Sequence, residues 1–193
     1  MNENLRRIVI IVAALNLAYF GVEFAVAVAI GSVSLFADSV DFLEDASLNF
    51  LIAIALGWST TSRARIGMAL AGILLIPGLA TLWTAWEKFL MPLPPASVPL
   101  SLAGAGALAI NLSCAFMLVQ FRTHGGSLTR AAFLSARNDA LANVAIIVAG
   151  FVTAYTLSGW PDLIVGLGIA AMNADAAREV WSAAREEHRV ANS

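Results

Sequence analysis

Long apolar stretches separated by short polar breaks run through the chain. A helix needs roughly 20 apolar residues to cross about 30 Å of hydrocarbon. Six stretches reach this length: Ile8–Ile30, Leu35–Trp58, Ile66–Met91, Pro99–Phe121, Thr129–Leu157 and Pro161–Trp181. The breaks contain residues typical of turns, such as Gly31-Ser32 and Gly125-Gly126. The pattern predicts an all-α, polytopic membrane protein with six transmembrane helices, in which residues 1–193 form a single transmembrane domain with no soluble domain.

The composition agrees with this prediction. Hydrophobic residues make up 60% of the chain and charged residues only 12%, about half of the roughly 25% that is usual in soluble domains. The single cysteine, Cys114, excludes a disulfide framework and a multi-thiolate metal site. The sequence contains no basic tract of the kind that binds nucleic acid, so no nucleic-acid partner is expected.

The first apolar stretch has an alternative interpretation. Arg6-Arg7, an apolar run and Ala27–Ala29 resemble a secretory signal peptide with its cleavage site. The run is longer than such a peptide needs, and it contains Glu23 on the same predicted helix face as Asn16. We therefore favour a retained first helix.

Basic residues fall almost entirely on one side of the predicted topology. Six helices place both chain ends on the same side, which also holds Arg6, Arg7, Arg63, Arg65, Arg122, Arg130, Arg178, Arg185 and Arg189. The other side holds only Lys88. Because Lys and Arg accumulate in cytoplasmic loops, the N and C termini are both predicted to be cytoplasmic.

Acidic residues occur within the second and fifth predicted helices. An Asp at the centre of a membrane helix costs roughly 2.5–3.5 kcal/mol on insertion scales, so such residues face the bundle interior and are functional by default. The second helix carries Asp38, Asp41 and Asp45, which share one stripe at about 100° per residue. Glu44 lies off this stripe.

The fifth helix carries a second polar stripe. Ser135, Asp139 and Asn143 follow one another at intervals of four residues, and Asn138 lies beside them. At 1.5 Å per residue, Asp45 is about 15 Å below the outer surface and Asp139 about 13 Å above the inner one. In a core about 30 Å thick the two meet near the midplane.

Two antiparallel helices could therefore present four oxygen ligands to one point. Such a pair of i, i+4 ligands from each helix can build a four-coordinate site for a divalent metal. The candidate ligands are Asp41, Asp45, Ser135 and Asp139, with Asp38, Asn138 and Asn143 as auxiliary candidates.

Polar groups in membrane helices can instead pair with one another, or here with Arg137, and merely specify helix packing. Three aspartates on one stripe supply too many acceptors for that role alone. They would also repel one another unless they are protonated or bound to a cation. We therefore favour a cation site.

Two segments resemble the cation diffusion facilitator family. Residues 31–46, GSVSLFADSVDFLEDA, resemble the pattern G-S-x-A-L-x-A-D-x-x-[HD]-x-x-x-D that leads into the second helix of that family. Residues 135–141, SARNDAL, resemble its fifth-helix pattern [HD]-x-x-x-D-A-L. The likeness covers nearly the whole chain in order, since further positions also fit: Asn16, Glu23, Trp86-Glu87, Asn111 and Pro161-Asp162.

The resemblance implies a dimeric, proton-coupled exporter of divalent metals in a lipid bilayer, the inner membrane of a bacterium. Asp41, Asp45 and Asp139 would be metal ligands, and Ser135 would occupy the fourth position. The metal is then a transported substrate, with zinc as first candidate and manganese, iron(II) and cobalt as others. No resident cofactor and no catalytic residue is expected.

The chain departs from the family pattern in three respects. Ser135 stands where His or Asp is usual, and an all-oxygen site favours harder ions than zinc. The cytoplasmic C-terminal domain typical of the family is expected to be absent, which would make this a short member. The His-rich loop of many members is reduced to His124.

A divalent cation would stabilise ionised carboxylates and displace protons, and protons arriving from the far side would expel the metal. Antiport is therefore the expected mechanism. One alternative is a non-transporting regulatory or partner subunit, which the serine at position 135 favours. A metal-dependent membrane enzyme is disfavoured, because Phe42 follows Asp41 where phosphatidyl-alcohol transferases carry Gly in D-x-x-D-G. We expect a transporter and not an enzyme.

Overall fold

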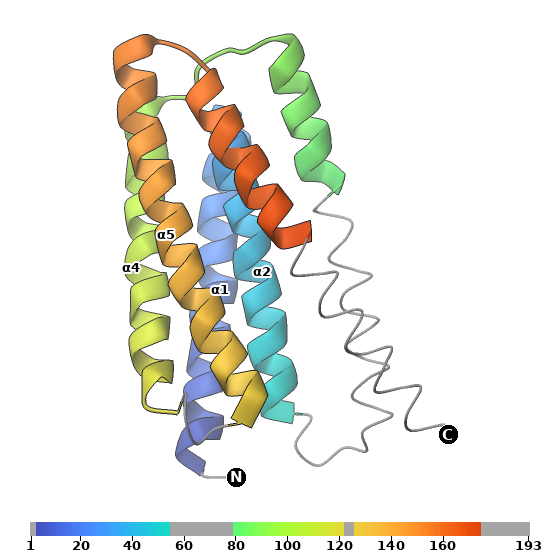
Figure 1. Cartoon of the computed structure of the whole chain (residues 1–193), viewed down its shortest axis with the longest axis vertical. Helices are drawn as coiled ribbons and strands as arrows, with labels where there is room; N and C mark the ends of the chain where they lie inside the picture. Colours follow the sequence, from blue (N-terminus) through green and yellow to red (C-terminus); the bar gives the residue numbers. More distant parts are fainter. Residues whose placement is uncertain (1–2, 55–78, 122–125, 175–193) are drawn as a thin grey trace, which may run out of the picture.

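The computed structural model describes residues 3–54, 79–121 and 126–174. Within these residues the chain forms six helices and no strand (Figure 1): α1 (Glu3–Ile30), α2 (Val33–Ile54), a helix over residues 79–90, α4 (Ser97–Val119), α5 (Gly126–Thr156) and a helix over residues 160–174. The predicted all-α fold with six helices is confirmed. The predicted ends at Trp58, Ile66 and Trp181 lie outside the described residues.

Successive helices run in opposite directions, up and down the molecule in Figure 1. α1 packs on α2 and α4 packs on α5, while contacts between α1 and α4 and between α2 and α5 close the group. Gly31 makes the tight turn between α1 and α2 with φ +64°, a backbone conformation that residues with a Cβ rarely adopt. The short turn places the start of α2 beside the end of α1.

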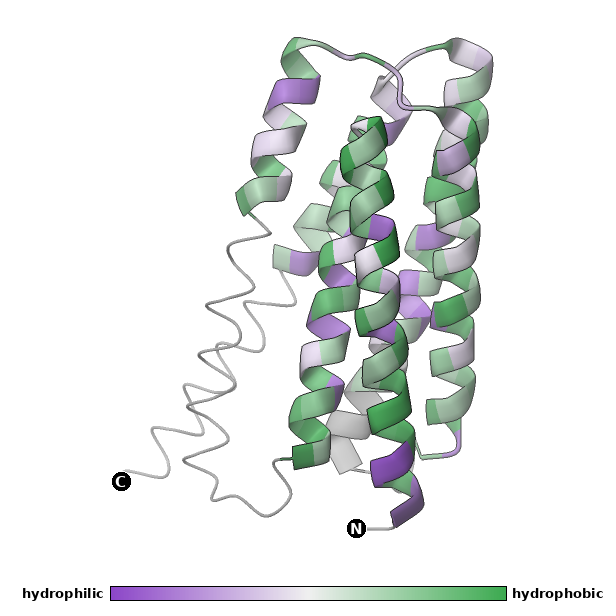
Figure 2. Cartoon of the chain, turned by 180° about the vertical axis from the view of Figure 1, so that it is seen from behind, coloured by the Kyte–Doolittle hydropathy of each residue, from purple (hydrophilic) through white to green (hydrophobic). Residues whose placement is uncertain are grey.

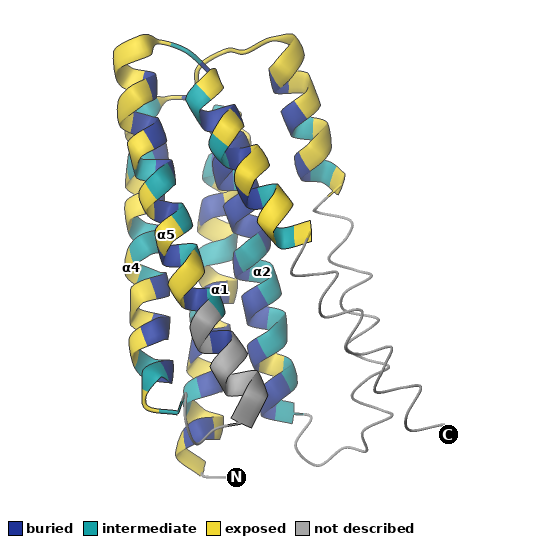
Figure 3. Cartoon of the chain, in the orientation of Figure 1, coloured by how far each residue is buried: buried dark blue, intermediate teal, exposed yellow. Residues whose placement is uncertain are grey.

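The distribution of polarity is inverted relative to a soluble protein (Figures 2 and 3). Large apolar and aromatic side chains face outward, with Phe116 79% and Tyr155 91% exposed. The polar side chains of Asn16, Glu23 and Asn143 are fully buried. An apolar exterior around a polar interior is the arrangement that a hydrocarbon solvent selects.

Three helices in the described parts of the chain are long and apolar enough to cross a membrane: α1, α4 and the Ser135–Thr156 part of α5. α2 is also long, but it contains Asp38, Asp41, Glu44 and Asp45. Its acidic residues lower its mean hydropathy, which is the cost of carrying a polar site on a membrane helix.

Two apolar clusters enclose the polar layer of the bundle. The cluster near the N-terminal end includes Val9, Val12, Ile52 and Leu118. The other, near the upper end in Figure 1, includes Ala27, Leu35, Leu100 and Ile146. Along α1, α2 and α4 the two clusters flank buried polar residues, so the interior changes from apolar to polar to apolar. These polar residues are Asn16, Glu23, Asp38, Asp45 and Asn111.

A buried carboxylate joins the helices at the upper end. Asp162 accepts hydrogen bonds from the hydroxyl groups of Ser32 and Ser34, both at 2.6 Å, and from the backbone N–H groups of Val33 and Ser34 at 2.9 and 3.2 Å. Lys88 Nζ lies 4.0 Å from Asp162 Oδ2 and donates to the Gly31 carbonyl at 2.7 Å. We call this arrangement the Asp162 clamp. It satisfies N–H groups at the start of α2 that have no partner within the helix.

Aromatic rings gather at the same end of the molecule. Trp86 and Phe89 stack with ring centroids 6.1 Å apart, and Phe89 meets Trp160 edge-on at 5.9 Å. Trp side chains are enriched at membrane–water interfaces, so this end fits a bilayer surface. Most of the arginines that predict the orientation lie outside the described residues. The cytoplasmic placement of both termini therefore stays a prediction.

Candidate metal site

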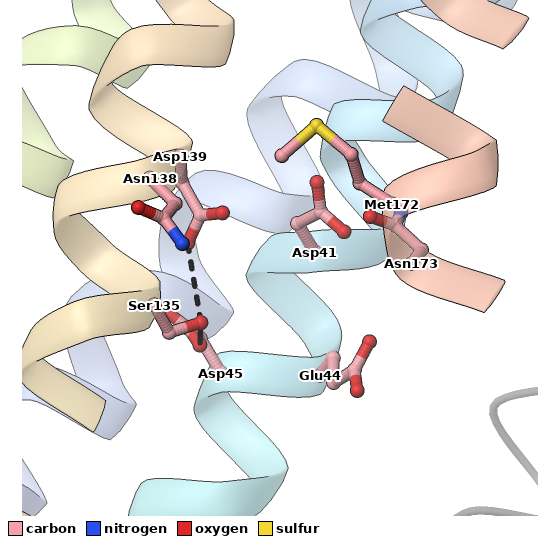
Figure 4. Close-up of a pocket in the computed structure, with 8 residues that line it drawn as sticks. All are labelled: Asp41, Glu44, Asp45, Ser135, Asn138, Asp139, Met172 and Asn173. Carbon is pink, nitrogen blue, oxygen red and sulfur yellow. Dashed lines mark hydrogen bonds between the residues drawn. The ribbon is translucent and has the colours of Figure 1, made fainter. Parts of the chain in front are cut away.

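A pocket of about 120 Å³ lies where α2 and α5 meet the helix over residues 160–174 (Figure 4). α2 and α5 supply most of its polar lining, and the third helix adds a thioether and an amide. The lining residues are Asp41, Glu44, Asp45, Ser135, Asn138, Asp139, Met172 and Asn173. The four candidate ligands predicted from the sequence therefore face one pocket.

The Ser135 hydroxyl lies between two of the aspartates. It donates a hydrogen bond to Asp45 Oδ1 at 2.9 Å, and its Oγ is 3.5 Å from Asp139 Oδ2. A serine hydroxyl has one proton, so only one carboxylate at a time receives it. Asp45 is 4% exposed. Its carboxylate therefore relies for stabilisation on this hydrogen bond and on any ion or proton that enters the pocket.

Asp41 lies on the opposite side of the pocket from this serine (Figure 4). Among the described residues, no three His, Cys, Asp or Glu side chains are grouped closely enough to hold one metal ion. The carboxyl groups that line the pocket are thus too far apart to hold one ion in this arrangement. To contact one ion, Asp41 and Asp139 must approach each other by side-chain rotation or by a shift of α2 relative to α5.

No cation neutralises the acidic lining in the described part of the chain. The one ion pair there joins Lys88 and Asp162, away from the pocket. Arg137 is exposed, and its guanidinium donates to the side-chain oxygen of Asn138 at 3.3 Å. These contacts disfavour the alternative in which the aspartates pair with Arg137. Uncompensated carboxylates in a low-dielectric layer attract either protons or a metal cation.

The auxiliary candidates separate into two groups. Asn138 lines the pocket, whereas Asp38 and Asn143 do not. Asn143 donates to Asp38 Oδ2 at 2.5 Å and accepts from Asn111 at 3.0 Å. These residues form a second polar group in the bundle interior.

Sequence reasoning missed three of the lining residues. Glu44 was expected to point away from the stripe, yet it lines the pocket. Met172 and Asn173 come from the last described helix, and Asn173 also donates to the Ala37 carbonyl at 3.4 Å. An amide within an apolar helix was the available signal for Asn173. Met172 gave none, because a methionine in such a helix is ordinary.

Comparison with known families gives one match. The model of the cation efflux transmembrane domain matches residues 9–186, which include every residue of the pocket. Among curated proteins, no relative matches this chain.

Proposed function

Because this chain belongs to the cation efflux family, we propose that it exports a divalent metal ion in exchange for protons through the pocket between α2 and α5. Family membership makes the chain a multi-pass membrane transporter of metal cations and not an enzyme. The resemblance seen in the sequence is thereby confirmed. The ion, the exchange with protons and the residues that bind the ion belong to the proposal.

The observation that carries the proposal is the contact across the pocket between α2 and α5. Asp45 of α2 accepts a hydrogen bond from the Ser135 hydroxyl of α5 at 2.9 Å, and Asp139 of α5 lies 3.5 Å from the same hydroxyl oxygen. In the proposed loaded state, Asp41, Asp45 and Asp139 bind the ion and Ser135 occupies the fourth position. The amide oxygen of Asn138 is an auxiliary ligand, because it lines the same pocket.

Charge balance supports an exchange with protons. With Glu44, the three aspartates place four carboxyl groups around a small pocket. These groups repel one another when ionised, so they cannot all stay ionised without a cation. A divalent ion stabilises the ionised forms and displaces protons. Protons that reach the pocket from the other side reverse the reaction, because they compete for the same oxygen atoms.

The donor set bears on which ion is carried. The resemblance to metal exporters makes zinc the first candidate. Carboxylate, hydroxyl and amide oxygens are harder donors than imidazole nitrogen, and they favour binding of manganese, iron(II) and cobalt as well. We propose zinc as the substrate, with these three ions as competitors. We also propose, from the resemblance alone, a homodimer in the inner membrane of a bacterium.

Reconstitution in liposomes that contain a pH-sensitive dye tests this function. Addition of zinc, manganese, cobalt or iron(II) to one side should move protons in the opposite direction to the metal. The rates should rank the ions. Folded protein that moves neither metal nor protons with any of them would instead support the non-transporting relative.

Replacing Ser135 by His is expected to shift the preference toward zinc. An imidazole at this position supplies the softer nitrogen donor that zinc prefers. We expect the ratio of zinc to manganese transport to rise by about tenfold, which corresponds to about 1.4 kcal/mol. The measurement is metal competition in liposomes.

Ser135→Ala is the matched control for this substitution, since it removes the hydroxyl without adding a nitrogen. It should lower transport without favouring zinc. An unchanged ranking of ions in the Ser135→His variant would show that position 135 does not contact the metal.

A further inference from the structure

A buried carboxyl group on α1 lies outside the metal pocket. Glu23 is fully buried, and within the described residues neither of its carboxyl oxygens receives a hydrogen bond. An ionised carboxylate without a partner is among the most costly groups to bury in a low-dielectric interior. Glu23 therefore needs either a bound cation or a proton of its own.

The group that faces Glu23 is a second carboxyl. Asp38 of α2 is also fully buried, and the two carboxyl groups are close enough to influence each other electrostatically. Asp38 Oδ2 receives the Asn143 amide, whereas Asp38 Oδ1 has no donor among the described residues. Both carboxyl groups therefore have oxygens without a donor in the same part of the bundle interior.

Two carboxyl groups can form a hydrogen bond only when one of them carries a proton. The amide groups nearby decide which one. Asn111 donates to Asn143, and Asn143 donates to Asp38, so the chain of donors ends on Asp38 as an acceptor. A proton on Glu23 then gives Asp38 Oδ1 its missing donor.

The other neighbours supply no positive charge. On α1, the Tyr19 hydroxyl lies near both carboxyl groups and donates to the Ala103 carbonyl at 2.6 Å. On α2, Asp41 adds a negative charge near Glu23 and Asp45 adds one near Asp38, and on α5 Asp139 is near enough to Asp38 to interact with it electrostatically. α4 contains no charged residue. In the described part of the chain, a proton is the cation available to the pair.

We propose that Glu23 and Asp38 form a proton-binding site, separate from the metal pocket, in which Glu23 carries the proton and donates it to Asp38. The pair holds one proton and one negative charge. We call it the Glu23–Asp38 pair.

The Glu23–Asp38 pair is connected to the pocket through two helices. Asp38 precedes Asp41 by three residues on α2, and Asn143 follows Asp139 by four residues on α5. A shift of α2 against α5 that closes the pocket around a metal must therefore also move Asp38 relative to Asn143. The proposal therefore extends to release of the shared proton during exchange, and this part of the inference rests on the proposed function.

Infrared spectroscopy of the metal-free protein tests the pair without any transport. At neutral pH the wild type should show a C=O stretching band of a buried protonated carboxyl, and Glu23→Gln should lose one such band. Glu87→Gln, at an exposed acidic position, is the matched control and should leave the band in place. Carboxyl C=O absorption of equal intensity in Glu23→Gln and in the wild type, or no such absorption in the wild type, would overturn the assignment.

Thermal unfolding in detergent gives a second measurement. The Gln amide is neutral and can donate to Asp38, so Glu23→Gln should melt at or above the temperature of the wild type. Glu23→Ala removes the donor and should melt lower. If Glu23→Gln fails to fold or melts as low as Glu23→Ala, the pair requires an ionised Glu23, and the proposal is wrong.

In liposomes, Glu23→Gln should carry fewer protons per metal ion than the wild type. An unchanged ratio would refute the role in exchange, although the infrared band would still decide whether the proton is there. If the wild type itself moves no metal, the proposed function fails. The infrared and unfolding results would still decide whether Glu23 carries a proton.

Discussion

Asp139→Asn is expected to lower metal transport by more than about 100-fold. Loss of an outer-shell partner of a metal ligand already costs about 10–100-fold in affinity or activity, and Asp139 is proposed to bind the ion directly. The substitution keeps the shape of the side chain but removes its negative charge. Tracer metal uptake into liposomes, at equal protein content and with equal melting temperature, measures the effect.

The contacts of Asp139 make this variant a clean test. Asp139 is half-buried, and its contact with the Ser135 Oγ is long, at 3.5 Å. Asn at this position can keep that contact, so the fold should be retained. Glu87→Gln, at an exposed position near the end of the helix over residues 79–90, removes a carboxylate elsewhere and should leave transport unchanged. Transport at the native rate in Asp139→Asn would remove the pocket from the mechanism.

The sequence was sufficient to predict which faces of α2 and α5 meet. Helical periodicity placed Asp41 and Asp45 on one stripe, and helix depth put Asp139 at the same level, so the pocket follows from geometry that every helix shares. The ligand roles of these residues stay a prediction until metal binding is measured.

Other features of the site depend on how far each helix is rotated and on what packs against it. Periodicity grouped Asp38 with Asp41, yet in the structure Asp38 contacts Asn143 and faces Glu23. Met172 enters the pocket because of the approach of a third helix. These features depend on side-chain packing between helices, and a pattern along one helix does not contain that information.

The Asp162 clamp illustrates the same limit. In the sequence, Asp162 was noted only as part of a resemblance, and its partners lie about 130 residues away, at Ser32 and Ser34. A single buried carboxylate that accepts four hydrogen bonds arises only when the start of α2 and the start of the last described helix are brought together. The clamp therefore fixes the position of the helix that carries Asp41 and Asp45.

Asp162→Ala is expected to destabilise the protein by about 3–5 kcal/mol, the usual cost of removing one partner of a buried ion pair. It would leave Lys88 without its carboxylate, and the hydroxyl groups of Ser32 and Ser34 would lose their acceptor. Two backbone N–H groups at the start of α2 would also be left without a partner in an apolar layer. Unfolding in detergent, followed by heat or denaturant, measures the loss.

Ser34→Ala is the matched control for the Asp162 clamp. It removes one donor and leaves Asp162 with the hydroxyl of Ser32 and both backbone N–H groups. Its cost should be about 1 kcal/mol, the net value of one hydrogen bond. Equal stability of Asp162→Ala and Ser34→Ala would mean that the clamp contributes no more than one ordinary contact. A much larger loss in Asp162→Ala would instead show that the start of α2 depends on a carboxylate from a distant helix.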